Sequence, residues 1–193
     1  MSLKNNLLLA LTSVLAVSTA SAGKKEDLAA QSTIELFKEA KATAPFFESA
    51  YAYAVFPSIG KGGIGVGGSY GKGQVFRNGK HLGDTSMTQV TIGFQLGGQA
   101  FSQMIFFEDE AAFTEFISGN YEFGAQVSAV ALTAGIEASA GTGGTTAGAS
   151  AGSDSAHAQH AYSMGVIIFT IAKGGLMYEA SIGGQKFKYH ALD

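Results

Sequence analysis

The stretch KGGIGVGGSYGKGQVF (residues 61–76) contains seven glycines in sixteen residues. Glycine at this density allows the backbone to approach another group closely. If the stretch is a β-strand, its residues point alternately to two faces. One face then carries apolar side chains, whereas the other is almost bare: Ile64, Val66 and Tyr70 share the first, and Gly63, Gly65, Gly67, Ser69 and Gly71 share the second. A bare face lets a helix or another sheet pack directly on the backbone, so the pattern predicts a packed strand.

A nucleotide-binding loop is the alternative for the same glycines. Residues 63–68, GIGVGG, satisfy the G-x-G-x-x-G pattern, which in dinucleotide-binding folds joins a strand to a helix. The residues that follow keep strand and turn character, and Asn78 with Gly79 is typical of a hairpin turn. A P-loop would need Ser or Thr after Lys72, where this chain has Gly73. We therefore expect no nucleotide partner.

The rest of the chain predicts helices first and strands afterwards. Lys24–Ala44 has a helical pattern, and Pro45 ends this helix and is suited to open a second short one. Glu108, Asp109 and Glu110 are suited to start one short helix between strands. Alternation predicts strands at Thr88–Leu96, Ala100–Phe107, Gly124–Thr133, Tyr162–Ile171, Leu176–Ile182 and Lys186–His190. The expected fold is α+β, with N-terminal helices packed on an antiparallel, barrel-like β-sheet.

Residues 1–22 have the pattern of a secretory signal peptide. Lys4 is followed by the largely apolar run Leu7–Val17, and Ala20–Ala22 has the small-residue pattern of a cleavage site. An uncleaved N-terminal anchor is the alternative. We expect residues 23–193 to form one exported domain in the periplasm, possessing a core of its own.

Residues 139–159 contain no large apolar side chain, and we interpret them as a mobile loop of Gly, Ala, Ser and Thr. His157 and His160 near Asp154 have the spacing of a metal-binding pair, but the sequence places no third ligand beside them, so solvated histidines are expected. The chain has no cysteine, and no serine lies in a G-x-S-x-G elbow. The sequence therefore predicts no enzyme, metal or cofactor.

Charge is distributed unevenly along the chain. Residues 24–80 carry eight basic and five acidic side chains, whereas residues 81–172 carry eight acidic side chains and no Lys or Arg. Because the net charge of the chain is negative, we do not expect it to bind nucleic acid. An anionic surface that contacts only the basic N-terminal third is compatible with this distribution. Ordinary solvated surface charge is the alternative.

Three segments of the sequence resemble the three blocks of SYLF domains, in the same order. They are YAVFPSIGKGGIGVGGSYGKGQVF (residues 53–76), IGFQLGGQAFSQMIFF (residues 92–107) and IIFTIAKGGLMYEASIGGQ (residues 167–185). The resemblance runs from about Lys25 to the C-terminus. SYLF domains occur in bacterial exported proteins and in eukaryotic proteins that bind phosphoinositides, and a yeast branch binds actin. The resemblance implies phospholipid or membrane binding rather than catalysis.

In the eukaryotic relatives, basic residues of an amphipathic N-terminal helix contribute to membrane contact. The resemblance implies lipid-binding roles for Lys24, Lys25, Lys38 and Lys41, and next for Lys61 and Lys173 in the glycine blocks. Two departures limit the comparison. An export signal keeps this protein from cytosolic phosphoinositides and actin, and four acidic residues dilute the positive helix (Glu26, Asp27, Glu35 and Glu39).

Because four lysines offset by four acids attract an anionic surface weakly, apolar insertion must add to the binding. Phe37, Phe46 and Phe47 are the expected wedges. The alternative for these aromatic residues is packing on the bare glycine face of the sheet. For the whole protein, the alternative function is a structural or scaffold protein that binds a protein partner, or itself, without lipid.

Overall fold

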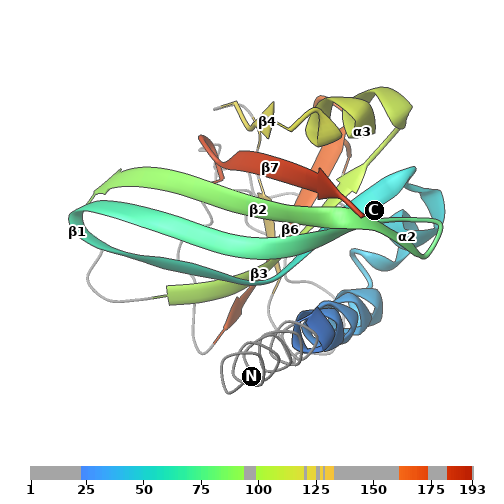
Figure 1. Cartoon of the computed structure of the whole chain (residues 1–193), viewed down its shortest axis with the longest axis horizontal. Coiled ribbons are helices and arrows are strands. Elements are labelled where there is room, and N and C mark those ends of the chain that lie inside the picture. Colours follow the sequence, from blue (N-terminus) through green and yellow to red (C-terminus); the bar gives the residue numbers. More distant parts are fainter. Residues whose placement is uncertain are drawn as a thin grey trace, which may run out of the picture.

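The computed structural model describes residues 23–93, 99–119, 121–124, 127, 129–132, 161–173 and 182–192 (Figure 1). A helix over residues 23–39 is followed by two further helices, α2 (Ala44–Ser49) and α3 (Glu110–Ile117). The strands are β1 (Ala52–Arg77), β2 (Lys80–Gly93), β3 (Gln99–Phe107), β4 (Tyr121–Glu122), β5 (Ala129–Leu132), β6 (Val166–Lys173) and β7 (Lys186–Ala191). The predicted signal peptide and the predicted loop at residues 139–159 lie outside the described residues.

The strands form one curled sheet in the order β4-β7-β2-β1-β3-β6-β5. Neighbouring strands are antiparallel, except that β5 runs parallel to β6. The α+β class and the barrel-like sheet are therefore confirmed, and the parallel pair is the one departure from the antiparallel expectation. Among the described residues, no helix is both long and apolar enough to cross a membrane.

The long strand β1 doubles back on itself, and Figure 1 shows its two arms meeting at one end of the sheet. The first arm, residues 52–61, pairs with β3, whereas the second arm, residues 65–77, pairs with β2. Counted as two strands, these arms make the sheet an eight-stranded half-barrel. We call the end where the arms meet the tip.

Glycines allow the two arms of β1 to approach each other. A Cβ atom at Gly73 would lie 2.6 Å from the carbonyl oxygen of Val55 and 2.7 Å from the ring of Phe56. At Gly71 it would lie 2.6 Å from Cγ1 of Ile59. Real Cβ contacts are not this short, so the bare face admits backbone packing as predicted. The group that packs there is the first arm of the same strand, not a helix.

The hairpin turn and the starts of α2 and α3 follow their sequence signals, but the first helix ends at residue 39 and not at Pro45 as predicted. Asn78 and Gly79 have φ of 51° and 75° and join Arg77 to Lys80 in a two-residue hairpin. Asp109 caps α3, because its carboxylate accepts a hydrogen bond of 2.9 Å from the amide of Ala112. Pro45 lies in the first turn of α2. The expected strand at Leu176–Ile182 falls almost entirely outside the described residues.

Each face of the sheet carries its own hydrophobic cluster. On the α3 face, residues such as Phe56, Ile105 and Phe187 pack with the side chains of α3. On the opposite face, which we call the N-terminal face, Val55, Phe106 and other residues pack with the helix over residues 23–39. Successive residues of β3 and β6 join alternate clusters, as the period of two requires.

Candidate functional site

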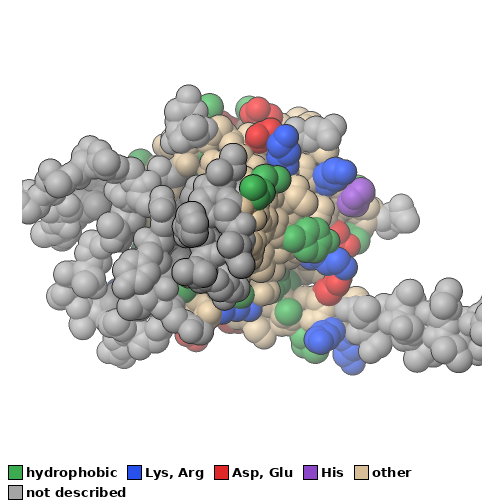
Figure 2. Space-filling view, turned by 90° about the vertical axis from the view of Figure 1, so that its left-hand side faces the viewer, with side chains coloured by type: hydrophobic (Ala, Val, Ile, Leu, Met, Phe, Trp, Pro, Cys, Tyr) green, Lys and Arg blue, Asp and Glu red, His purple; other side chains and the backbone are tan. Residues whose placement is uncertain are grey.

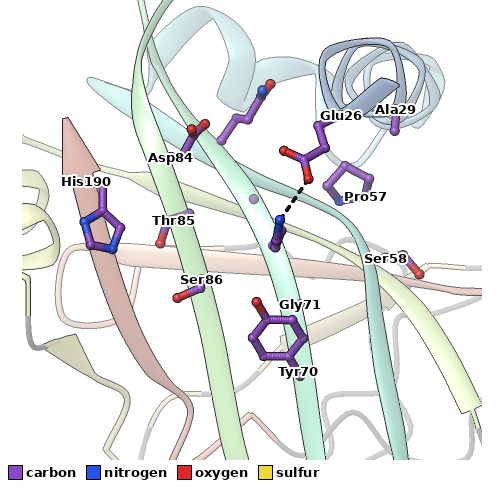
Figure 3. Close-up of a pocket in the computed structure, with 13 residues that line it drawn as sticks. Glu26, Ala29, Pro57, Ser58, Tyr70, Gly71, Asp84, Thr85, Ser86 and His190 are labelled. Carbon is purple, nitrogen blue, oxygen red and sulfur yellow. Dashed lines mark hydrogen bonds and ion pairs between the residues drawn. The ribbon is translucent and has the colours of Figure 1, made fainter. Parts of the chain in front are cut away.

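A groove of about 530 Å³ lies between the N-terminal helix and the N-terminal face of β1, β2 and β7 (Figure 3). Polar contacts close one side of it. Lys72 Nζ donates a hydrogen bond of 3.0 Å to Glu26 Oε1, and Gln74 Nε2 donates one of 2.7 Å to Asp27 Oδ1. The first turns of the helix are therefore attached to the second arm of β1.

Lys72 is the basic residue of this groove. Its hydrogen bond with Glu26 and the charge of that carboxylate raise the pKa of Lys72 above its ordinary value. Because a raised pKa keeps an amine protonated at neutral pH, Lys72 carries a full positive charge there. The pair is exposed, with 64% of the Lys72 side chain and 50% of the Glu26 side chain accessible, so the bond between them contributes little stability.

The groove offers polar contacts but no assembled catalytic group within the part of the chain that is described. Ser86 and His190 both line it, from neighbouring strands, without a hydrogen bond between them. Among the described residues, no three His, Asp or Glu side chains lie close enough together to hold a metal ion. The polar and charged lining of the groove can contact a polar or charged surface.

The structure places the predicted lysines of the N-terminal helix at its exposed surface. Lys24 and Lys25 lie in the first described turn. Lys38 forms a 2.9 Å ion pair with Glu35, and its Nζ lies 5.9 Å from the ring centre of Phe47. Lys41 is also exposed, just after the helix.

Lys61 and Lys173 lie at the tip of the sheet, on either side of β3. Lys61 pairs with Gln99, whereas Lys173 pairs with the next residue, Ala100. Since neighbouring residues of a strand point to opposite faces, the two lysines project from opposite faces of the sheet. Lys173 shares the N-terminal face with Ile171. The structure brings these lysines to one end of the molecule but not to one surface.

The three predicted wedges are packed within the protein. Phe37 is fully buried in the cluster of the N-terminal face, and Phe46 and Phe47 are partly buried against it. The ring centre of Phe47 lies 4.9 Å from that of Phe106, and the ring of Phe46 lies 5.4 Å from that of Phe169. These aromatic residues therefore pack on the sheet, which was the alternative to membrane insertion. Their partners are aromatic side chains of β3 and β6 and not the glycines of β1. The glycine face is occupied by the other arm of β1.

Sequence reasoning missed a surface that we call the tip face. It is the exposed part of the N-terminal face formed by Val66, Gly68 and Tyr70 of β1 with Thr88 and Val90 of β2. The alternation of polar and apolar residues in β2 assigns Val90 and Gln89 to opposite faces of the strand, but it does not show which face is buried. In the structure Val90 is 77% exposed and Gln89 only 4%.

Lysines border this surface. Lys186 and Lys188 of β7 are exposed on either side of the buried Phe187. In the sequence, the alternation of charged and apolar residues in this strand is the signal that indicates two exposed lysines. Figure 2, which faces the tip, shows exposed hydrophobic and basic side chains close together.

Comparison with known proteins gives one informative relative. No protein-family model matches the chain. The chain is 30% identical over 158 residues to Beta cell expansion factor A of Aeromonas veronii, and the match covers 80% of this chain. It covers 51% of that protein, so the chain spans about half the length of this curated relative. The chain is thus a β-rich α+β protein that is similar to this relative over most of its own length.

Proposed function

We propose that the chain is a SYLF-family domain that binds anionic phospholipid surfaces and catalyses no reaction. The three sequence blocks support the family, and the similarity to the Aeromonas protein extends over two of these blocks at least, because it covers 80% of the chain. The blocks fall on β1, on β2 to β3, and on β6 with the residues that follow it. They therefore include the strands at the centre of the sheet.

The observation that carries this proposal is that large exposed hydrophobic side chains lie beside lysines. Leu28 is 56% exposed and follows Lys24 and Lys25 on the N-terminal helix. Tyr70 is 54% exposed and shares one face of β1 with Lys72. Proteins that lie on a membrane combine apolar insertion with attraction to anionic lipids. Each lysine near an anionic surface contributes about 1 kcal/mol.

The predicted signal peptide supports a periplasmic role for this activity, at the surface of a membrane of the envelope. The second candidate is a scaffold that binds a protein partner, because an exposed patch such as Val66, Tyr70 and Val90 is also typical of protein interfaces. The lysines around the patch favour the lipid surface.

Flotation with liposomes tests the proposal. The purified protein is mixed with liposomes of graded phosphatidylglycerol or cardiolipin content, at low and at high salt. We expect binding that rises with the anionic lipid and falls with salt, since the Debye length shortens from about 10 Å at 0.1 M to about 3 Å at 1 M. Absence of binding to anionic and neutral liposomes alike would reject the proposal and favour the protein-partner function.

A further inference from the structure

Where β1 pairs with β2 near the tip, the polarity of the sheet is opposite to that of an ordinary half-buried sheet. The buried cross-strand pair there is polar, since Ser69 is 5% exposed and Gln89 4% exposed. Gln89 Nε2 donates a hydrogen bond of 2.9 Å to the carbonyl of Gly183. The side chains that face outward are apolar, with Val66 65% exposed and Val90 77% exposed. Large apolar side chains gathered on the outside of a sheet mark a contact surface.

Strand register places lysines next to this apolar surface. Thr88 lies between Tyr70 on β1 and Lys186 on β7. In the adjacent row, Ser86 lies between Lys72 and Lys188.

A fourth lysine borders the other side of the surface. On the far side of β1, Gly60 pairs with Ala100, and Ala100 pairs with Lys173. Lys173 shares the N-terminal face with the three lysines above, so positive charge borders the apolar residues of the tip face on both sides.

The surface between the lysines is open. Gly60 and Gly62 are exposed, and a Cβ atom at either position would meet nothing within 4 Å. Gly68 is also exposed. Side chains are therefore absent at these positions on both arms of β1, which leaves an open surface there. Such a shape fits an extended surface better than a single inserted side chain.

We propose that the tip face is the surface by which this protein docks on an anionic phospholipid bilayer, with Val66, Tyr70 and Val90 entering the headgroup region and the bordering lysines contacting lipid phosphates. This inference rests on the proposed function and identifies the surface that performs it. The acids nearby have partners: Glu26 pairs with Lys72 at 3.0 Å, Glu122 pairs with Lys186 at 3.3 Å, and Asp84 lies 3.2 Å from His81. Exposed pairs of this kind are weak, so a lipid phosphate replaces the carboxylate readily.

The N-terminal helix is the competing surface. Among its described residues, the large exposed apolar side chains are Leu28 and Leu36, and the nearby charges are balanced between lysines and acids. Its largest apolar residue, Phe37, is buried in the protein. The tip face offers exposed aromatic and aliphatic groups without movement of any element.

Single-cysteine labelling distinguishes the two surfaces, and the natural chain has no cysteine to interfere. The variants Val90→Cys, Leu28→Cys and Met164→Cys each receive a polarity-sensitive fluorophore. Met164 is the matched control, because it is 72% exposed in the turn before β6 and belongs to neither surface. Vesicles of phosphatidylcholine with increasing phosphatidylglycerol are then added. We expect a blue shift for the label at residue 90 and none for the label at residue 164.

A second set of variants tests the charges and the apolar groups separately. Lys186→Gln with Lys188→Gln should weaken vesicle binding by about thirtyfold. Val66→Ser with Val90→Ser should weaken it by about tenfold. Lys80→Gln with Met164→Ser is the matched control and should bind as the natural protein does. All these side chains are exposed, and circular dichroism verifies that the variants fold.

The outcomes separate this inference from the proposed function. A blue shift at residue 28 but not at residue 90, with normal binding of the tip variants, would overturn the tip face while leaving lipid binding intact. No flotation and no blue shift in any labelled variant would overturn both. Binding to neutral and anionic vesicles alike, with no loss in the lysine variant, would overturn the role of the lysines.

Discussion

At the scale of single residues, Gly73 decides how closely the two arms of β1 approach. A Cβ atom there would meet the backbone oxygen of Val55, which cannot rotate away as a side chain can. We therefore expect Gly73→Ala to lower the free energy of unfolding by about 1–3 kcal/mol, the usual cost of overpacking a core. Urea denaturation followed by circular dichroism measures this change.

Gly60 on the first arm is the matched control for that substitution. It lies in the same strand, but nothing is within 4 Å of its virtual Cβ atom. Gly60→Ala should leave stability unchanged or raise it by about 0.4–1 kcal/mol, because alanine restricts the unfolded chain. If both substitutions lower the free energy of unfolding equally, the glycines of β1 are required for backbone conformation and not for close packing of the two arms.

At the scale of elements, the N-terminal helix is held by apolar burial more than by charge. Phe37 is fully buried on the sheet, whereas the pair between Glu26 and Lys72 is exposed. We expect Phe37→Ala to cost about 3–5 kcal/mol of stability. Glu26→Gln should cost less than about 1 kcal/mol. Denaturation midpoints of the two variants measure the contrast, and a larger loss for Glu26→Gln would mean that charge anchors the helix.

Local signals in the sequence were sufficient to predict most elements. Pro45, Asp109 and the Asn78–Gly79 pair act within a few residues, and the structure places a helix start, a helix cap and a hairpin turn at them. Burial was harder to predict. Alternation separates Gln89 from Val90 but cannot identify the buried face, because that depends on which strands and helices cover the sheet.

The candidate site was predictable only in part for the same reason. Lys24 and Lys25 are exposed on the helix, as a helix rich in charge predicts. Lys72 becomes a neighbour of Lys186 and Lys188 only through the register of β1, β2 and β7, of which β7 is distant in sequence from the other two. The sequence predicted that Phe46 and Phe47 insert into a membrane. In the structure they pack against aromatic side chains of the sheet, which are distant in sequence and cannot be identified from local pattern.

At the scale of the whole molecule, one pair of buried amides joins distant parts of the fold. Gln103 lies on β3, and Gln185 lies in the turn that leads into β7. Each side-chain amide donates to the other, at 2.9 Å and 3.1 Å, and both residues are fully buried. Because β3 and β7 are separated in the sheet by β1 and β2, this contact helps to fix the curl of the half-barrel.

A double-mutant cycle measures what this contact contributes. In Gln103→Leu the amide of Gln185 stays buried without its partner, and an orphaned buried polar group costs about 1–3 kcal/mol. The reverse variant, Gln185→Leu, should lose a similar amount. The variant with both substitutions should be no less stable than either single one, because both amides are then gone. If the two losses simply add, each glutamine acts through its own surroundings, and the curl of the sheet is fixed by the glycines of β1 and the two hydrophobic clusters alone.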